Sequence, residues 1–473
     1  MSGGEGRRTK IVATIGPASD DGETLARMVE AGLDVARLNF SHGTPEEHAA
    51  TAERVRDAAS RAGRPVGVLQ DLPGPKLRLG PLRDGIAELK PGDRLTLVCG
   101  SSEEGDAERM PVAWAGLAAA VGPPDVVYLA DGSVRLAVEE VRTGSGEIDT
   151  TVEIGGTVSS RQGINVPGEL ATLPSMPEDD LELLRFGERI GVDMVALSFV
   201  RRPEDISDVR EHTETPLIAK IEKRGAVERA EAIVRAADCV MVARGDLGIE
   251  LRIEEVPLVQ KRVIDLAGAL ARPVITATQM LESMVTSPRP TRAEVTDVAN
   301  AILDGTDALM LSQETAVGAH PVKAVAMMAA IAEHTEAELP HERWNQWRVR
   351  RDERDPAYTV AHNACAAARE LGLAALICPT RSGRSARLIS AHRPVVPVYA
   401  LCPEEEVVRR CSVMWGVRAA LIEHHEVTEA LIADCARRVV ELGWVERGER
   451  VGITAGLPTK SSGTTSLFQI QEC

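Results

Sequence analysis

The segment from residue 216 to residue 250 constrains the fold of this chain more than any other. It contains two short apolar runs, each typical of a buried strand, separated by a stretch rich in Ala, Glu and Arg that predicts a helix. Lys220 and Glu222 end the first run and point to the same side, because side chains alternate along a strand. Asp246 follows the second run. We therefore expect a βαβ unit in which one ammonium and two carboxylates converge where parallel strands end.

A charged strand end that turns into solvent as a surface ion pair is the simplest alternative for these residues. Two facts favour a functional site: the charges directly follow Val- and Ile-rich runs, and polar residues also end other predicted strands. Two carboxylates from different strands suit a hard divalent cation such as Mg²⁺. A lysine beside them could neutralise a transferring phosphoryl group or an enolate. The pattern predicts phosphate chemistry.

The same alternation of strand and helix recurs along the chain. Three predicted strands precede a break at about residue 73, and five more follow after about residue 166. The predicted strands lie at 9–15, 33–39, 66–69, 193–199, 216–221, 239–243, 273–278 and 307–311. Eight such repeats predict a (β/α)₈ TIM barrel, with a doubly wound open sheet as the alternative.

The break and the C-terminal part predict two further domains. The break has short strands, Gly and Asp turns and little helix, which indicates a small β-barrel lid inserted after the third strand. After a polar linker, strands and helices alternate again, which predicts a C-terminal α/β regulatory domain. We expect the barrel domain at 1–72 and 166–335, the lid domain at 73–165 and the regulatory domain at 350–473.

The charge of the chain restricts its partners. It has 71 acidic and 54 basic residues among 473, for a net charge of -17 at pH 7, which argues against binding to nucleic acid or to an anionic membrane. An anionic ligand must therefore enter a local basic pocket. The eight cysteines are scattered without a C-x-x-C pair, no run reaches membrane-spanning length, and the N-terminal residues are polar. We expect a cytoplasmic protein with reduced thiols.

Polar residues end almost every predicted barrel strand. On residue type alone, a threonine or serine at such an end is more simply a strand or cap residue than a ligand. The strand-end residues are Arg37, Asn39, Ser41, His42, Asp71, Phe199, Lys220, Glu222, Arg244, Gly245, Asp246, Thr278, Ser312 and Glu314.

Several long segments carry a resemblance to the pyruvate kinase family. They include TKIVATIGPAS from residue 9, VARLNFSHG from residue 35, VMVARGDLGIE from residue 240 and PRPTRAEVTDVANAILDGTDALMLS from residue 288. The resemblance implies a barrel with an inserted lid and a C-terminal domain. It also implies Mg²⁺-dependent phosphoryl transfer from phosphoenolpyruvate to ADP, giving pyruvate and ATP in the last step of glycolysis, by a homotetramer.

The resemblance also assigns roles around the substrate. Glu222 and Asp246 would hold Mg²⁺ or Mn²⁺, and the amides of Gly245 and Asp246 would bind the substrate carboxylate. Lys220 would stabilise the phosphoryl group and the enolate. Thr278 would lie beside the enolate carbon in a water relay that delivers the proton.

Further residues would contact phosphate groups. Arg37 and Arg78 would clamp the transferring phosphate. Asn39, His42 and Arg78 would lie near the nucleotide phosphates, together with Arg161, which stands where the family usually has a lysine.

The family's monovalent-cation site differs in this chain. Asn39, Ser41 and Asp71 match its usual ligands, but Leu72 replaces a threonine and Lys76 replaces an acid. An ammonium near Asp71 would supply the charge of K⁺ and repel K⁺ itself. We therefore expect activity without K⁺, with an exposed hinge lysine as the alternative.

A loop in the C-terminal domain resembles the effector loop of allosteric members. It combines hydroxyls, arginines and amides at a predicted helix start, which suits an anionic sugar phosphate or nucleotide, with TKSSGTT at 459–465 facing it. An unliganded capping loop is the alternative. The loop residues are Thr380, Arg381, Ser382, Gly383, Arg384 and Ser385.

Two alternative functions remain open from the sequence. A weakly active regulatory paralogue would explain Gln162 and Gln313, which stand where the family usually has Lys and Gly. Another Mg²⁺/enolate barrel enzyme, such as a carbon–carbon lyase, would share the strand-end acids. The lid and the nucleotide-side residues Arg37, Asn39 and Arg78 count against a lyase.

Overall fold

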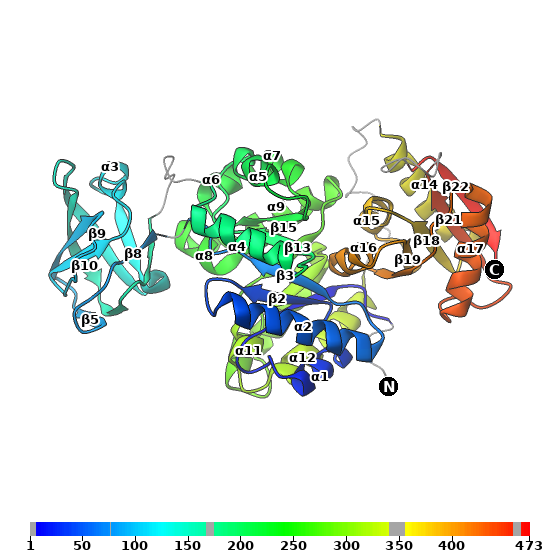
Figure 1. Ribbon diagram of the computed structural model, residues 1–473, viewed down its shortest axis with the longest axis horizontal. Coiled ribbons are helices and arrows are strands. Elements are labelled where there is room, and N and C mark those ends of the chain that lie inside the picture. Colours follow the sequence, from blue (N-terminus) through cyan, green and yellow to red (C-terminus); the bar gives the residue numbers. More distant parts are fainter. Residues whose placement is uncertain (1–5, 76, 167–174, 340–354, 457–464) are drawn as a thin grey trace.

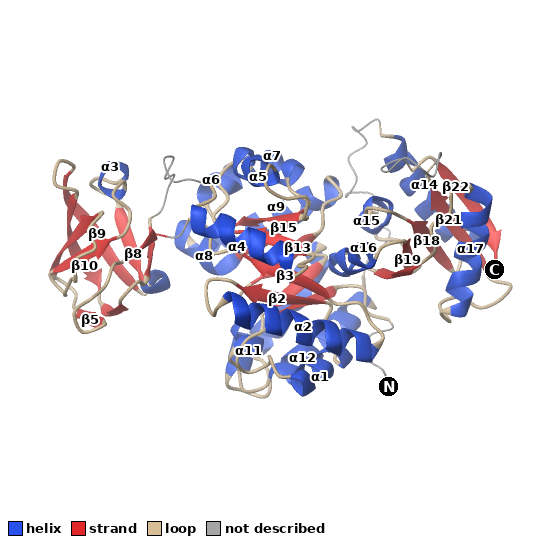
Figure 2. Cartoon of the chain, in the orientation of Figure 1, coloured by secondary structure: helices blue, strands red, loops and turns tan. Residues whose placement is uncertain are grey.

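The computed structural model describes residues 6–75, 77–166, 175–339, 355–456 and 465–473, which form three parts in a row (Figure 1). A barrel lies in the middle, with a small β domain at one end and an α/β domain at the other. Figure 2 shows that strands dominate the small domain, whereas the other two parts combine strands with helices. None of the described helices is long and apolar enough to cross a membrane.

Eight parallel strands close into a barrel in the order β1-β17-β16-β15-β14-β13-β3-β2. This confirms the predicted (β/α)₈ barrel and excludes the open sheet. The strands are β1 (Lys10–Thr14), β2 (Val35–Asn39), β3 (Gly67–Asp71), β13 (Met194–Leu197), β14 (Leu217–Ile221), β15 (Cys239–Ala243), β16 (Val274–Ala277) and β17 (Ala308–Leu311).

Helices surround the barrel. They are α1 (Gly22–Glu30), α2 (Pro45–Ala62), α4 (Glu178–Arg189), α5 (Pro203–Arg210), α6 (Arg224–Glu228), α7 (Ala230–Ala236), α8 (Arg244–Glu250), α9 (Val256–Ala269), α10 (Arg292–Asp304), α11 (Gln313–Ala316) and α12 (Pro321–Glu336), with 3₁₀ turns at Ile253–Glu255 and Glu282–Val285. The single helix predicted after β14 is instead two helices, because Arg229, with φ of -105° and ψ of 19°, leaves the helical region. Periodicity missed this break, since Ala226 and Ala230 on either side of it are both buried.

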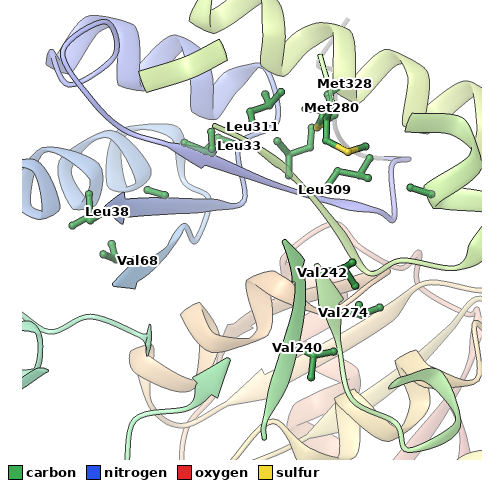
Figure 3. Packing of buried hydrophobic residues seen from close by; sticks show 14 of the residues in the cluster. Leu33, Leu38, Val68, Val240, Val242, Val274, Met280, Leu309, Leu311 and Met328 are labelled. Carbon is green, nitrogen blue, oxygen red and sulfur yellow. The ribbon is translucent and has the colours of Figure 1, made fainter. Parts of the chain in front are cut away.

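Alternation along the strands separates two apolar cores. In β15, Val240 and Val242 belong to the outer core between strands and helices, whereas Cys239 and Met241 belong to the core inside the barrel. Figure 3 shows the two valines among other residues of the outer core.

The same alternation turns polar side chains inward near the ends of the strands. Ile218 of β14 and Leu69 of β3 lie in the inner core. Lys220 and Asp71, two residues further along each strand, therefore point into the barrel at its C-terminal end.

The lid domain has a seven-stranded sheet, β4-β12-β8-β9-β10-β6-β7, and a two-stranded sheet, β11-β5. The edges of the larger sheet meet, because the Ala113 N–H donates to the Arg78 carbonyl (3.1 Å) and Leu79 bridges to Val112. The sheet thus closes as expected for a small β-barrel. Its elements are β4 (Leu77–Arg78), β5 (Ile86–Leu89), β6 (Arg94–Cys99), β7 (Arg109–Val112), α3 (Leu117–Ala120), β8 (Val126–Leu129), a 3₁₀ turn at Ala130–Gly132, β9 (Val134–Arg142), β10 (Glu147–Ile154), β11 (Gly156–Ser159) and β12 (Gly163–Asn165).

The C-terminal domain is a five-stranded sheet in the order β20-β19-β18-β21-β22, parallel except for β22. Its α/β architecture agrees with the prediction, whereas the residues at which each domain begins and ends stay predictions. The elements are α14 (Pro356–Leu371), β18 (Ala375–Pro379), α15 (Arg384–Ala391), β19 (Val398–Cys402), α16 (Glu405–Arg410), a 3₁₀ turn at Cys411–Val413, β20 (Val417–Leu421), α17 (Thr428–Glu441), β21 (Arg450–Ala455) and β22 (Leu467–Glu472).

The C-terminal domain packs against the end of the barrel at which the strands begin. Arg409 pairs with Asp193 (2.8 Å), and Arg393 pairs with Asp307 (2.7 Å). These aspartates lie directly before β13 and β17, and each also accepts a backbone N–H from a neighbouring strand. The opposite end, where the strands stop, carries the lid and the inward-pointing polar residues.

Candidate active site

Lys220 lies at the centre of a buried polar group that we call the Lys220 cluster, with Ser198, Glu222 and Asp71. Its ammonium donates to Ser198 Oγ (2.7 Å) and lies 3.3 Å from Glu222 Oε2 and 3.5 Å from Asp71 Oδ1. Burial would lower the pKa of Lys220, but Asp71, Glu222 and Asp246 outweigh burial and raise this pKa above its usual value. The lysine is therefore a permanent cation.

The Glu222 carboxylate is fully buried, and its two oxygens differ in their contacts with the described residues. Oε1 accepts the Phe199 N–H (2.6 Å), whereas Oε2 accepts no hydrogen bond from any described residue. Burial, opposed by Lys220 and reinforced by Asp246, raises the pKa of Glu222 to about 7. Such an oxygen beside a second acid is suited to bind a divalent cation, so Glu222 and Asp246 fit Mg²⁺ or Mn²⁺. Over the described ranges no group of three or more His, Cys, Asp or Glu could hold a metal ion, but Mg²⁺ commonly takes only one or two protein carboxylates.

Gly245 and Asp246 lie in the first turn of helix α8, beside a strained turn. The Gly245 N–H donates to Thr278 Oγ1 (2.8 Å), and the Thr278 hydroxyl donates to the Ala277 carbonyl (2.6 Å). Thr278 and Gln279 have φ of 69° and 52°, in the left-handed region that costs a non-glycine residue about 1–3 kcal/mol. The surroundings therefore hold the Thr278 hydroxyl at the start of α8.

Arg244 holds this turn, a role that the sequence did not indicate. Its guanidinium donates to the carbonyls of Thr278 (2.7 Å) and Ala277 (3.3 Å) and pairs with Asp297 (2.7 Å). The partners come from other strands and helices. Only the tertiary structure reveals that this arginine positions Thr278.

Arg37 and Asp71 form a buried ion pair next to Lys220. Arg37 Nε lies 2.7 Å from Asp71 Oδ2, and Nη1 donates to Thr14 Oγ1 (2.9 Å). Burial would raise the pKa of Asp71, but Lys220 and Arg37 lower it further than burial raises it. Asp71 therefore stays ionised, and it already balances two cations.

Ser198 belongs to the Lys220 cluster, although sequence reasoning missed it. Its hydroxyl accepts from Lys220 and lies 2.8 Å from the Leu72 carbonyl and 3.3 Å from Asp71 Oδ1. Its place directly after β13 was the available signal. An uncharged serine at that position cannot be told from an ordinary helix-capping serine in the sequence.

The other predicted residues after β2 and β3 lie at or near the barrel rim. Asn39 is in register with the end of β3, and its Oδ1 accepts the Ser41 N–H (3.3 Å). His42 is exposed, whereas Leu72 is buried in the outer core. Lys76, the predicted substitute for the monovalent cation, lies outside the described residues.

Arg78 and Arg161 lie together in the lid. Arg78 Nη1 donates to the Arg161 carbonyl (3.2 Å), and Arg78 is in register with Gly163, because β4 pairs with β12. The neighbouring Gln162 shapes the lid turn, since its Oε1 accepts the Ser159 N–H (2.7 Å). Among the contacts of the described residues, none joins Arg78 to the Lys220 cluster.

The turn after β17 tolerates its glutamine. Gln313 is the first residue of α11, is exposed and has no positive φ, so the position does not require glycine. Glu314 is buried, and its carboxylate accepts the N–H groups of Leu281 (3.0 Å) and Ser312 (2.7 Å). The structure thus gives Glu314 a role in holding this turn.

The predicted effector loop, 380–385, forms the turn into α15. Gly383 has φ of 78°, and its N–H donates to Thr380 Oγ1 (3.0 Å). Ser385 Oγ lies 2.6 Å from Thr465 Oγ1. The loop therefore faces the end of the segment expected opposite it, of which residues 459–464 lie outside the described residues.

Two family models match most of the chain. The model described as pyruvate kinase, barrel domain, matches residues 6–325, and the one described as pyruvate kinase, alpha/beta domain, matches residues 358–471. Both matches agree with the fold.

Individual proteins give the same result. A pyruvate kinase of Geobacillus stearothermophilus is 42% identical over 470 residues, which cover 98% of this chain and 80% of that protein. A pyruvate kinase of Clostridium acetobutylicum is 38% identical over 471 residues, covering 98% and 99%. The crystal structure of a pyruvate kinase from Cryptosporidium parvum has a TM-score of 0.91 and 33% identity, covering 99% of this chain and 96% of that chain.

Proposed function

This chain belongs to the pyruvate kinase family and is a phosphotransferase, and from that premise we propose that the Lys220 cluster transfers the phosphoryl group of phosphoenolpyruvate to ADP. The products would be ATP and the enolate of pyruvate, which then takes up a proton. The observation that supports this most is the buried Glu222 carboxylate, one oxygen of which accepts no hydrogen bond from the described residues and lies beside the charged Lys220. Glu222 is suited to bind a divalent cation, and Lys220 is suited to bind an anionic phosphate.

Glu222 and Asp246 would hold the Mg²⁺ or Mn²⁺ that the reaction uses. When bound, the ion supplies positive charge to phosphate and carboxylate oxygens. The N–H groups of Gly245 and Asp246 would bind the substrate carboxylate, for which the Gly245 N–H must exchange its present acceptor, Thr278 Oγ1.

Lys220 would stabilise the transferring phosphoryl group and the enolate, because its charge is fixed in a site shielded from water. Arg37, held by Asp71, and Arg78, which belongs to the lid, would bind phosphate oxygens. Thr278 would lie beside the enolate carbon in a water relay that delivers the proton.

The nucleotide phosphates would lie between the barrel rim and the lid. Asn39 and His42 would approach them from the turn after β2, and Arg78 and Arg161 from the lid. Because both arginines are part of the lid, binding of ADP would depend on the orientation of the lid relative to the barrel.

We also propose that the reaction needs no K⁺. Asp71 already balances Arg37 and Lys220, and the Leu72 side chain offers no oxygen to a cation. Lys76 would supply the positive charge that K⁺ gives to other members of the family.

A coupled assay of pyruvate formation tests the main proposal. Purified protein with phosphoenolpyruvate, ADP and Mg²⁺ is expected to form pyruvate and ATP in equal amounts. Omission of ADP or addition of a chelator should abolish the product. No pyruvate under these conditions would refute the assignment and leave the regulatory paralogue or the lyase.

The loop 380–385 would bind an anionic sugar phosphate or nucleotide effector. Calorimetric titration with representatives of both classes tests this, and no heat of binding from either would contradict it. The protein would be a cytoplasmic homotetramer. Light scattering that gives the mass of a single chain would contradict the tetramer.

A further inference from the structure

Lys223 joins the lid to helix α8. Its ammonium donates to Glu250 Oε1 (2.5 Å), to Asn165 Oδ1 (3.2 Å) and to the Val166 carbonyl (3.5 Å). Glu250 is the last residue of α8, and Asn165 is the last residue of β12, where the chain leaves the lid sheet. One side chain therefore ties the exit of the lid to the helix that begins with the Arg-Gly-Asp segment.

The contact is largely buried, and every ammonium hydrogen has an acceptor. The side chains of Lys223 and Glu250 are 11% and 1% exposed. A buried ion pair is tolerated when its polar atoms all find partners, and here the three ammonium hydrogens have three acceptors. Such an arrangement holds one geometry and resists sliding of the lid against α8.

The barrel contacts of Lys223 lie near the proposed metal site. Glu250 shares α8 with Asp246. The ammonium lies 5.6 Å from the centroid of the Phe199 ring, a cation–π distance, and the Phe199 N–H holds the carboxylate of Glu222. Lys223 thus connects the lid to the part of the barrel rim that surrounds the proposed site.

We propose that Lys223 is a positioning residue that sets the orientation of the lid relative to α8 and thereby places Arg78 and Arg161 over the substrate. This inference rests on the proposed pyruvate kinase reaction, and Lys223 itself takes no part in the chemistry. Without its ammonium the lid stays covalently attached, but fewer of its orientations present the two arginines to ADP.

The test compares Lys223→Met, Lys223→Arg and Lys90→Met in the full chain. Lys90 is an exposed lid lysine and serves as the matched control. Lys223→Met is expected to raise KM for ADP about tenfold, while Lys223→Arg keeps the donors and stays within about threefold of the unmodified enzyme. The affinity for Mn²⁺ in the absence of nucleotide, measured by electron paramagnetic resonance, should change less than about twofold.

A second variant guards against a folding defect. Lys223→Met alone removes the ammonium that pairs with the buried Glu250 carboxylate, and losing one member of a buried ion pair destabilises a fold. Lys223→Met combined with Glu250→Gln removes both charges and should restore the melting temperature, yet keep the raised KM for ADP.

The outcomes separate the two proposals. Unmodified protein that forms no pyruvate refutes the proposed reaction and this inference with it. An active unmodified enzyme whose Lys223→Met variant keeps a normal KM for ADP refutes only this inference. If the KM for ADP and the melting temperature both recover in the double variant, Lys223 has only a structural role. That result also refutes the inference.

Discussion

Lys220 and Asp71 keep each other charged inside the barrel. The carboxylate of Asp71 helps to raise the pKa of Lys220, and the ammonium lowers the pKa of Asp71. Neither group is therefore set to exchange a proton near neutral pH. The proton for the enolate must come by another route, for which we propose Thr278 and water.

Replacement of Lys220 by Met is expected to reduce kcat by a factor on the order of 10³, because the developing charge loses its nearest cation. The melting temperature should also fall, since Asp71 and Glu222 lose their shared partner. Steady-state kinetics together with Lys220→Arg, which retains the charge, checks this. A folded Lys220→Met variant with nearly normal kcat would contradict the role of Lys220.

The monovalent-cation proposal predicts an exchange of dependence. Activity of the unmodified enzyme should change less than about twofold when K⁺ replaces tetramethylammonium. The double variant Leu72→Thr with Lys76→Glu should be at least about tenfold more active in K⁺ than in tetramethylammonium. Leu72→Thr alone is the control and should remain independent, because Lys76 still supplies the charge. Strong activation of the unmodified enzyme by K⁺ would refute the proposal.

Among the elements, the strands carried most of what the sequence could predict. Apolar runs and the alternation of side chains along a strand are local properties, so they indicated the eight barrel strands and the shared side of Lys220 and Glu222. The sequence did not predict the roles of Ser198 and Arg244. Ser198 acts through Lys220 on a neighbouring strand, and Arg244 acts through a turn at Thr278 and Gln279. Both turn residues have positive φ values, which such residues rarely adopt. Such contacts arise only after the barrel closes.

The hinge into the lid is held by the start of α4. Asp180 Oδ2 accepts the Gly74 N–H (2.7 Å), and Gly74 has φ of 69°. A Cβ at Gly74 would lie 2.7 Å from the Ser198 carbonyl oxygen, so only glycine fits between the hinge and the Lys220 cluster. The backbone geometry of the hinge at Gly74 therefore depends on the buried Asp180.

The hinge acid should make stability depend on pH. Burial raises the pKa of Asp180 from 3.8 to about 6, so the folded state binds this proton more tightly than the unfolded state. The contribution of Asp180 to stability is thus greatest below the unfolded pKa and falls by about 1.4 kcal/mol per pH unit until the pH passes the folded pKa.

Asp180→Asn removes this titration. Its melting temperature relative to the unmodified protein is expected to rise from about pH 4 to about pH 6 and then to level off. Thermal melts across this range measure the difference, and Glu182→Gln, at an exposed position of the same helix, is the control. A difference that does not vary with pH would contradict the raised pKa.

In the whole molecule, the C-terminal domain forms the floor of the barrel. Arg393 is 1% exposed, pairs with Asp307 and donates to the Gly305 carbonyl (2.7 Å). Its guanidinium also lies 4.7 Å from the centroid of the Trp415 ring. One residue of the C-terminal domain thus neutralises an acid on which two barrel strands depend.

Arg393→Met is expected to destabilise the protein by about 3–5 kcal/mol, because it leaves a buried carboxylate uncompensated. The matched control is Arg252→Met, which breaks exposed ion pairs with Glu254 and Glu255 and should cost less than about 1 kcal/mol. Melting temperatures of the two variants measure the contrast. Equal, small shifts would show that the floor does not need this ion pair.

The paired aspartates at the strand starts bear on how such a chain can be divided or recombined. Asp307 receives its arginine from the C-terminal domain, and Trp415 of that domain packs in the outer core of the barrel. A chain that ends after α12 would therefore leave Asp307 without its arginine and expose the apolar surface that Trp415 covers. We expect such a barrel to be inactive on its own. Chimaeras made from two such enzymes should exchange the C-terminal domain together with the barrel residues that receive it.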